Sequence, residues 1–329
     1  MKASSHASRG IRRLAVALAA GLVLGGLTGC GDRDSAALSH PESDGGRPRI
    51  VATTTMLADL VRTLAGEDFA VASLMAPGVD PHTYEMPARA IALIRGADAV
   101  IYNGHLLEGK IPDLLAPLAS QGKHVLAVAE SLPAESLIHP DGDFAGHADP
   151  HVWGDVRLWK SAIAPVADIL KKLRPDRADA IAARAAAYAG ELDALDAWIR
   201  QQIASLPEAN RLIMTSHDAF GYFGRAYGID VIGVQGISTA TEAGLADIVG
   251  AVDLIRQRGV RAIFVESSVS RAVIERIARD AGVSVGGELY SDSTGPAGNP
   301  VTIGGETWDA GTYIGMMRHN VSVIVEALR

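Results

Sequence analysis

The chain has 329 residues, of which 48% are hydrophobic and 21% are charged, and its formal net charge at pH 7 is -8. This length and apolar content are sufficient for one large or two medium domains with hydrophobic cores, which excludes disorder for most of the chain. An acidic chain without a basic face is a poor partner for a phosphate backbone, so no nucleic acid is expected to bind.

The amino terminus has the pattern of an export signal. The first residues carry a cluster of positive charges: Lys2, Arg9, Arg12 and Arg13. The apolar stretch at residues 14–27 is too short to span a bilayer comfortably, and it runs into LTGC at residues 27–30. This ending resembles the bacterial lipobox, in which the peptide is cut before the cysteine and lipid is attached to it. We therefore expect a lipoprotein signal peptide at residues 1–29, with an ordinary secretory peptide as the alternative.

Cys30 is the only cysteine of the chain, so no internal disulfide can form. A single cysteine at a cleavage site is best explained as the lipidation site that holds the mature protein to a membrane. Residues 30–47 contain little apolar periodicity and many Asp, Ser and Gly residues, which predicts a flexible tether. The expected location is the cell envelope, either on the periplasmic side or at the outer surface.

The folded part is predicted to begin at residue 48 and to alternate strands with helices. Apolar and β-branched runs predict strands, and helical spacing predicts helices: strands at residues 49–54, 69–74, 99–102 and 125–128, and helices at 56–65 and 88–94. Strands that alternate with helices form a parallel sheet covered on both faces. We therefore expect an N-terminal α/β lobe at residues 48–157.

A second block at residues 207–329 repeats this plan. Residues 211–216 predict a strand and residues 219–227 predict the helix after it, as in the first block. The stretch at residues 254–265 resembles the one at residues 93–102. The expected fold class is therefore α/β, with two lobes on parallel sheets, although common α/β patterning without duplication is the alternative.

A helical region at residues 158–206 separates the two blocks. Its only glycine is Gly190, and Pro175 is placed to open a second helix. A helix over residues 176–204 would be about 40 Å long at about 1.5 Å per residue. Such a rod can join two lobes stiffly, but a packed core helix of a single domain explains the pattern equally well.

Three of the ten histidines lie in loops where a ligand site is expected. His82 lies in a turn-rich loop after a predicted strand, His151 follows a proline before a helical region, and His217 follows the first strand of the second block. Loops at the carboxyl ends of parallel strands converge on the ligand crevice of α/β folds. A carboxylate, Asp292, follows the last strand-like run and completes the set.

A histidine taken singly is more often a hydrogen-bonded structural residue than a ligand, but these four residues together favour a metal site. Imidazole nitrogens suit zinc and other first-row ions, and one carboxylate offsets part of the charge of the ion. Gaps of at least 66 residues separate the four, which disfavours a small structural zinc knuckle because such knuckles use close pairs. Two donors come from each block, so the ion would lie between the lobes. Four protein donors leave no open coordination position, which predicts binding without catalysis.

Four motifs, in order along the chain, resemble those of the zinc and manganese solute-binding proteins that serve bacterial ABC importers. They are DPHTYE at residues 80–85, DPHVW at 149–153, HDAFGYF at 217–223 and GTYIGMMRHN at 311–320. The resemblance runs from about residue 48 to the carboxyl end. It implies two α/β lobes joined by a long rigid helix, with an interlobe metal site whose ligands are His82, His151, His217 and Asp292. It also implies one divalent metal ion as cargo and an ABC permease as partner; we expect a monomer.

The third ligand position bears on the choice of metal. Family members with glutamate there are associated with manganese, so His217 favours zinc, with manganese a close second. Many zinc specialists also carry a histidine-rich loop before the second ligand, whereas residues 135–148 supply only His139 and His147. We expect these two histidines to be solvated loop residues rather than ligands.

The sequence gives weaker support to a role for other polar residues and to two other functions. Asp218, Glu85 and Glu266 could orient the imidazoles, but an exposed or lobe-packing role is favoured for each. A secreted zinc-dependent enzyme is the first alternative function, and it would need an open coordination position and a general base. A surface adhesin is the second.

Overall fold

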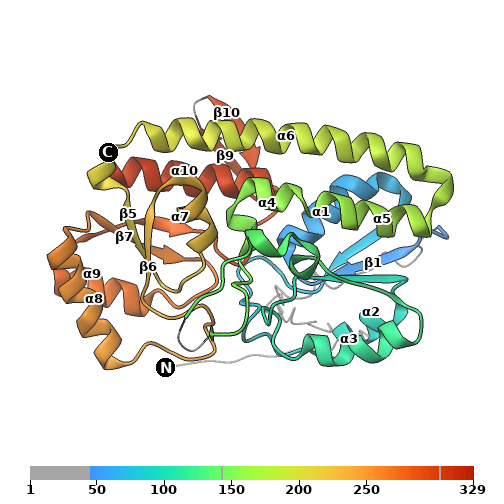
Figure 1. Cartoon of the computed structure of the whole chain (residues 1–329), viewed down its shortest axis with the longest axis horizontal. Helices are drawn as coiled ribbons and strands as arrows, with labels where there is room; N and C mark the ends of the chain where they lie inside the picture. The colour runs from blue at the N-terminus through green and yellow to red at the C-terminus, as the bar shows by residue number, and fades with distance from the viewer. Residues whose placement is uncertain (1–44, 142–143, 304) are drawn as a thin grey trace, which may run out of the picture. The chain divides into compact units, whose positions relative to one another are not determined.

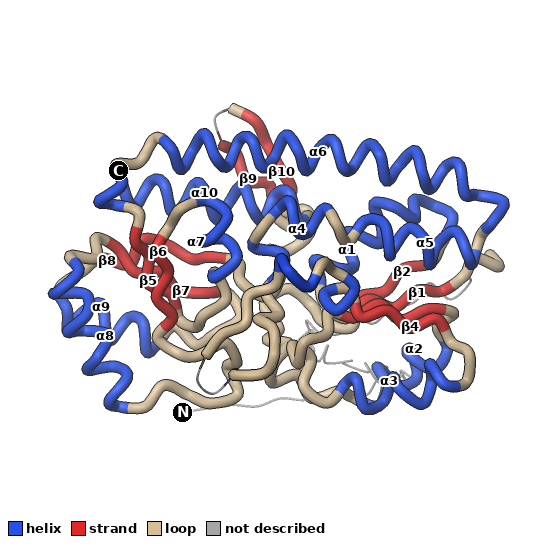
Figure 2. The backbone as a smooth tube through the Cα atoms, viewed as in Figure 1, coloured by secondary structure: helices blue, strands red, loops and turns tan. Residues whose placement is uncertain are grey.

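A computed structural model describes residues 45–141, 144–303 and 305–329 (Figures 1 and 2). The predicted signal peptide, Cys30 and most of the predicted tether lie outside the described residues. Within these ranges, no helix is both long enough and apolar enough to cross a membrane.

The first lobe contains a parallel four-stranded sheet in the order β2-β1-β3-β4. Its strands are β1 (Arg49–Ala52), β2 (Ala70–Ser73), β3 (Ala99–Tyr102) and β4 (His124–Ala127). Strand β1 is central, because Val51 pairs with Ala72 on one side and with Val100 on the other. All four strands lie within one residue or two of the predicted runs.

Helices cover both faces of this sheet (Figure 1). They are α1 (Thr55–Ala65), α2 (Ala88–Gly96) and α3 (Ile111–Ser120). Because strand side chains alternate between faces, Ile50 and Ile101 join the cluster around α1, whereas Val51 and Val100 pack with α2 and α3. Burial on both faces is the reason for the uninterrupted apolar runs of β1 and β3.

The second lobe repeats the strand order as β6-β5-β7-β8, again all parallel. The strands are β5 (Leu212–Thr215), β6 (Asp230–Gly233), β7 (Ala262–Glu266) and β8 (Ser284–Leu289). Helices α7 (Gly221–Tyr227) and α10 (Tyr313–Leu328) share one apolar cluster with this sheet, and α8 (Leu245–Arg258) and α9 (Ala272–Ala281) share the other. The prediction of two α/β lobes on parallel sheets is confirmed.

Helix α6 (Ala178–Ala204) packs against both lobes. It contacts α1 and α5 (Ile163–Leu173) of the first half and α10 of the second, and Figure 2 shows it running past both sheets. Its buried apolar and aromatic side chains recur three, four or seven positions apart: Ile181, Tyr188, Leu192, Leu195, Ile199 and Ile203. The helix is thus both the long connection and a packed core helix. It begins two residues later than predicted, because Pro175 opens a 3-10 turn, Pro175–Arg177.

One hydrophobic cluster crosses from the first lobe to the second. It holds Ile50 of β1 together with Phe264 of β7, and Trp159 of the short helix α4 (Val156–Lys160) lies 5.4 Å from Tyr313 of α10 between ring centroids. The described residues all fall within one compact unit. No break in the core marks the predicted domain boundaries at residues 157/158 and 206/207, so these boundaries stay predictions.

Two local features differ from the sequence prediction. The strand predicted to reach residue 54 ends at Ala52, because the Thr54 hydroxyl accepts a hydrogen bond from Leu57 N at 3.4 Å and caps α1. An antiparallel hairpin of β9 (Pro300–Ile303) and β10 (Glu306–Asp309) was not predicted. Its strands, PVTI and ETWD, contain a proline and two carboxylates, which are residue types that disfavour strands.

Helix α10 begins against a carboxylate of α1. Asp59 Oδ2 accepts a hydrogen bond from Tyr313 N at 2.9 Å, which ties the first lobe to the start of this helix. Burial raises the pKa of Asp59 to about 6. The Tyr313 N–H and Arg62 oppose the rise, and the charges of Asp309 and Glu191 add to it.

Asp59 should make stability depend on pH. Because its folded pKa lies above the ordinary value of 3.8, the fold favours the protonated acid and loses stability as pH rises from about 4 to about 6. The Asp59→Asn variant lacks this loss, so its free energy of unfolding relative to wild type should rise by about 2–3 kcal/mol between about pH 4 and pH 7. Urea unfolding across this range measures the effect, with the exposed Asp253→Asn on α8 as control. A difference that stays constant with pH would contradict the assignment.

Candidate metal centre

The four predicted ligands come together where strands of both sheets end. His82 lies in the loop between β2 and α2, His151 follows β4, His217 lies two residues past the end of β5, and Asp292 follows β8. One donor atom from each lies within 4.8 Å of the donor atoms of the other three. His151, His217 and Asp292 are buried, and His82 is half-buried.

The distances between donor atoms match the shell of one small ion. The Nε2 atoms of His82 and His151 are 3.3 Å apart. Asp292 Oδ1 lies 3.5 Å from His151 Nε2, and Asp292 Oδ2 lies 3.3 Å from His217 Nε2. Donors placed tetrahedrally at about 2.0–2.1 Å from a zinc ion are separated by about 3.3–3.4 Å. Three pairs of side chains therefore already stand near the separations that a single bound ion requires, and all four donors lie within 4.8 Å of one another.

The ring of His151 is oriented by a carboxylate that the sequence analysis did not single out. Asp149 Oδ1 lies 2.7 Å from His151 Nδ1 and also accepts the His151 backbone N–H at 2.9 Å. A carboxylate at Nδ1 fixes the proton on that nitrogen and leaves Nε2 free to bind an ion. The repeated DPH motif was an available signal, since Asp80 accepts the His82 backbone N–H in the same way at 2.9 Å.

The ring of His217 is oriented by Glu266, for which the exposed or lobe-packing interpretation is wrong. Glu266 Oε2 lies 2.6 Å from His217 Nδ1, and Glu266 Oε1 accepts the His217 backbone N–H at 2.9 Å. Glu266 is the last residue of β7, which neighbours β5, so its side chain reaches His217, two residues past the end of β5, while only 2% exposed. Glu85 is exposed, in agreement with the prediction, and Asp218 is half-buried.

The charges at the site favour a bound cation. Burial lowers the pKa of His82 to about 3, against the opposing charge of Asp292, so this imidazole keeps its lone pair. Burial alone would raise the pKa of Asp292, but the neighbouring His217 holds it below its usual range. Burial would lower the pKa of His217, but Glu266 and Asp292 raise it well above the ordinary value. Among the described residues, Asp292 Oδ1 has no hydrogen-bond partner, a costly state for a buried oxygen that metal coordination would relieve.

Hydrogen bonds between the lobes hold the Asp292 segment against the first lobe. Trp153 Nε1 donates to Ser291 O at 2.8 Å, and Gly78 N donates to Ser293 Oγ at 2.8 Å. Thr294 N donates to Thr55 Oγ1 at 2.7 Å. These contacts fix the carboxylate relative to the imidazoles of the first lobe, so the donors are arranged by the fold itself.

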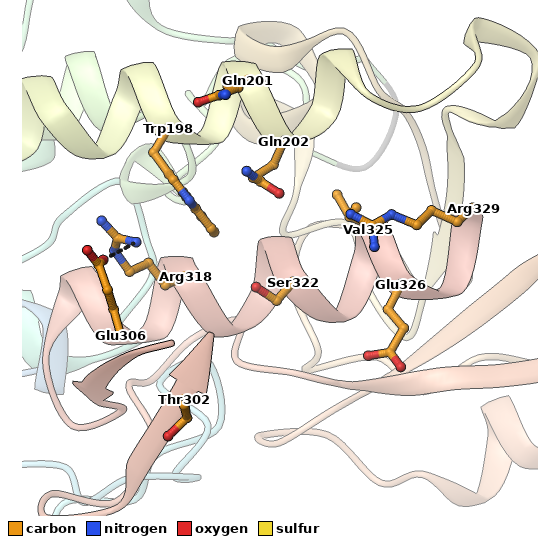
Figure 3. A pocket seen from close by; sticks show the side chains of 10 residues that line it. All are labelled: Trp198, Gln201, Gln202, Thr302, Glu306, Arg318, Ser322, Val325, Glu326 and Arg329. Atoms are coloured by element: carbon orange, nitrogen blue, oxygen red, sulfur yellow. Dashed lines mark ion pairs between the residues drawn. The ribbon is translucent and has the colours of Figure 1, made fainter. Parts of the chain in front are cut away.

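A pocket of about 700 Å³ lies away from the four candidate ligands, between α6, α10 and the β9–β10 hairpin (Figure 3). Arg318 stacks between Trp198 and Trp308, with its guanidinium carbon 4.7 and 3.9 Å from the ring centroids. The same guanidinium lies 3.6 Å from Glu306, and the figure shows the two side chains pointing toward each other. The four candidate ligands do not line this pocket, and its contacts serve to hold the hairpin against the helices.

His139 and His147 are not part of the metal-ligand group found among the described residues. Both are exposed, in agreement with the prediction of solvated loop residues, and the ring of His147 lies 5.8 Å from that of Phe144.

Asp149 and Glu266, the carboxylates that orient the candidate ligands His151 and His217, supply a test of the site. Loss of a partner that orients a ligating histidine typically lowers metal affinity about 10–100-fold. We therefore expect Glu266→Gln and Asp149→Asn each to weaken zinc binding within that range while the far-ultraviolet circular dichroism stays unchanged. Competition with a zinc chelator measures the affinity, and Glu85→Gln removes an exposed carboxylate as the matched control. Affinities equal to wild type in both variants would show that these carboxylates do not support the ligands.

The comparison with known families covers most of the chain. The sequence profile of the family described as zinc-uptake complex component A, periplasmic, matches residues 50–327. This span includes both lobes and all four candidate ligands.

Individual relatives are similar over nearly their full length. The manganese-binding lipoprotein MntA of Bacillus subtilis (strain 168) is 41% identical over 308 residues, covering 92% of this chain and 95% of that protein. The zinc-binding protein TroA of Treponema pallidum (strain Nichols) is 40% identical over 323 residues, covering 96% and 98%. A solved structure of the periplasmic zinc-binding protein TroA from Treponema pallidum superposes with a TM-score of 0.81 at 40% identity, covering 86% of this chain and 99% of that one.

Proposed function

This chain belongs to the zinc-uptake complex component A family, the solute-binding proteins of metal ABC importers, and from this premise we propose that it captures one divalent transition-metal ion outside the cytoplasm and delivers it to an ABC importer. The observation that carries the proposal is the convergence of four donor atoms from two lobes within 4.8 Å of one another. Three are imidazole nitrogens and one is a carboxylate oxygen, a donor set suited to a first-row dication.

The same donor set supports binding without catalysis. Four protein donors complete a tetrahedral shell, whereas hydrolytic zinc sites keep a position open for water or substrate. We therefore propose that the protein is not an enzyme and that the ion is cargo. Neither the site nor the relatives support the alternatives of a secreted zinc enzyme or a surface adhesin.

We propose zinc as the favoured cargo, with manganese a close second. The tetrahedral donor distances and three imidazoles favour zinc. Asp292, however, directs one oxygen toward His151 and the other toward His217, so a bidentate carboxylate could raise the coordination number, as manganese prefers. Relatives of similar identity are named for each metal. The metal that the protein carries when isolated from its own cell envelope decides between the two.

The partners follow from this function. The proposed partner is the permease of a metal ABC importer, and the proposed attachment is lipid on Cys30, in line with a relative that is named a lipoprotein. One chain supplies all four donors, so a monomer is sufficient for binding.

Substitution of the donors tests the proposed function. His82→Ala and His217→Ala each remove one candidate ligand. Loss of a carboxylate that orients a ligating histidine lowers affinity about 10–100-fold, and loss of the ligand itself should weaken zinc binding by more than this. Isothermal titration with zinc, by chelator competition where binding is tight, measures affinity and stoichiometry. One ion per wild-type chain is expected, and His139→Ala and His147→Ala should bind as wild type does. Wild-type affinity in His217→Ala would contradict the proposal.

A further inference from the structure

A pocket of about 360 Å³ lies beside the metal centre, between the His82 loop and the segment that follows β6. We call it the access pocket. Its walls carry hydroxyls and carboxylates from both lobes, including Asp80, Thr83, Ser216, Thr239, Glu242 and Ser268. At about 30 Å³ per molecule it has room for about ten waters, enough for a partly hydrated ion. Oxygen atoms of this kind can replace the water around a divalent cation in stages.

The inner wall of the access pocket directly adjoins the metal centre. Ser268 Oγ donates to Asp292 Oδ2 at 3.1 Å. Ser216 immediately precedes His217, is 4% exposed, and has a buried hydroxyl without a hydrogen-bond partner among the described residues. An unpartnered buried hydroxyl in the wall of a polar pocket is accounted for by water or a polar ligand bound there.

One hydrogen bond joins the two lobes across this pocket. Thr239 Oγ1, in the segment after β6, donates to Asp80 Oδ2 at 2.6 Å. Thr239 is 8% exposed, so water competes poorly for this bond. The Thr83 hydroxyl donates to the same oxygen at 3.1 Å, and Asp80 Oδ1 accepts the His82 backbone N–H. We call the Asp80–Thr239 hydrogen bond the latch, because it holds the loop that carries His82 against the second lobe.

His82 is the donor best placed to move. The other three donors are buried, and each is held by a side chain: His151 by Asp149, His217 by Glu266, and Asp292 by Ser268. His82 is half-buried, and its loop is tied to Asp80 through the backbone. Release of the latch would free this loop while the other three donors stay in place.

We propose that the metal ion reaches and leaves the centre through the access pocket, and that the latch controls both directions. This inference rests on the proposed function and adds Thr239 and Glu242 to the residues that serve it. Thr239 positions the His82 loop, and Glu242, which is exposed, attracts the cation toward the opening.

Stopped-flow measurements with zinc alone test the latch. Thr239→Val keeps the side-chain shape and removes the donor. A hydrogen bond to a charged acceptor changes an equilibrium constant by about tenfold or more. Zinc dissociation into excess chelator should therefore accelerate about tenfold in this variant. Association should accelerate as well, so the dissociation constant should change less than the dissociation rate. Ser238→Ala, whose hydroxyl accepts a hydrogen bond from Ala240 N within the same segment, is the matched control.

A second variant tests the route itself. Glu242→Gln should slow zinc association about two- to threefold at low salt, and the difference should vanish at high salt, because screening removes attraction by an exposed charge. Glu326→Gln makes the same change in the pocket of Figure 3 and should leave association unchanged. Glu242 also lines a neighbouring pocket, which contains Asp141 and not Asp80, so Asp141→Asn is needed to separate the two possible routes. The proposed route predicts normal association in Asp141→Asn, and association slowed in Asp141→Asn as much as in Glu242→Gln would overturn it.

The kinetic outcomes separate this inference from the proposed function. Tight zinc binding by wild type with unchanged rates in Thr239→Val would overturn the latch and leave the function standing. Faster dissociation with unchanged association would also overturn it, because Thr239 would then only stabilise the bound state. Failure of wild type to bind zinc tightly would overturn the function itself.

Discussion

The burial of Asp292 among three imidazoles is the constraint on which the rest of the structure depends. An ionised carboxylate removed from water is costly unless opposite charge or hydrogen bonds compensate for the loss of hydration. Here Ser268 binds one oxygen, and imidazoles lie beside both. A divalent ion at the centre would supply the remaining compensation. The outer carboxylates Asp149 and Glu266 add negative charge around it, so the whole arrangement is stable in the form that binds a cation.

This arrangement depends on two lobes that behave as one packed body. Helix α6, the hydrophobic cluster that crosses both lobes, and the hydrogen bonds of the Asp292 segment all fix the second lobe against the first. A hydrophobic core shared by both lobes resists their separation as two rigid halves, because separation would expose apolar surface to water. Exchange of the ion is therefore better served by a small movement of the His82 loop than by separation of the lobes.

Much of the fold could be predicted from the sequence, because apolar runs such as β1 and β3 are buried on both faces and glycines end α1 and α7. The candidate ligands could be predicted from the rule that loops after parallel strands converge, together with the family resemblance. The role of Glu266 could not, because it depends on β7 lying next to β5, a pairing that local pattern does not specify. The β9–β10 hairpin was missed because proline, glutamate and aspartate are poor strand formers, and its position against α10 depends on the contact of Arg318 with Trp308, which local pattern does not specify.

X-ray absorption spectroscopy at the metal edges, on protein isolated from its own cell envelope, tests the central claim most directly. It identifies the element and reports the number and type of its neighbours in one experiment. The account predicts one zinc ion per chain, with three imidazole nitrogens and carboxylate oxygen at about 2.0–2.2 Å. Manganese with the same nitrogen donors would change the cargo and keep the centre. A spectrum without multiple-scattering from imidazole, or one that requires sulfur, would contradict the claim that these four side chains bind the ion.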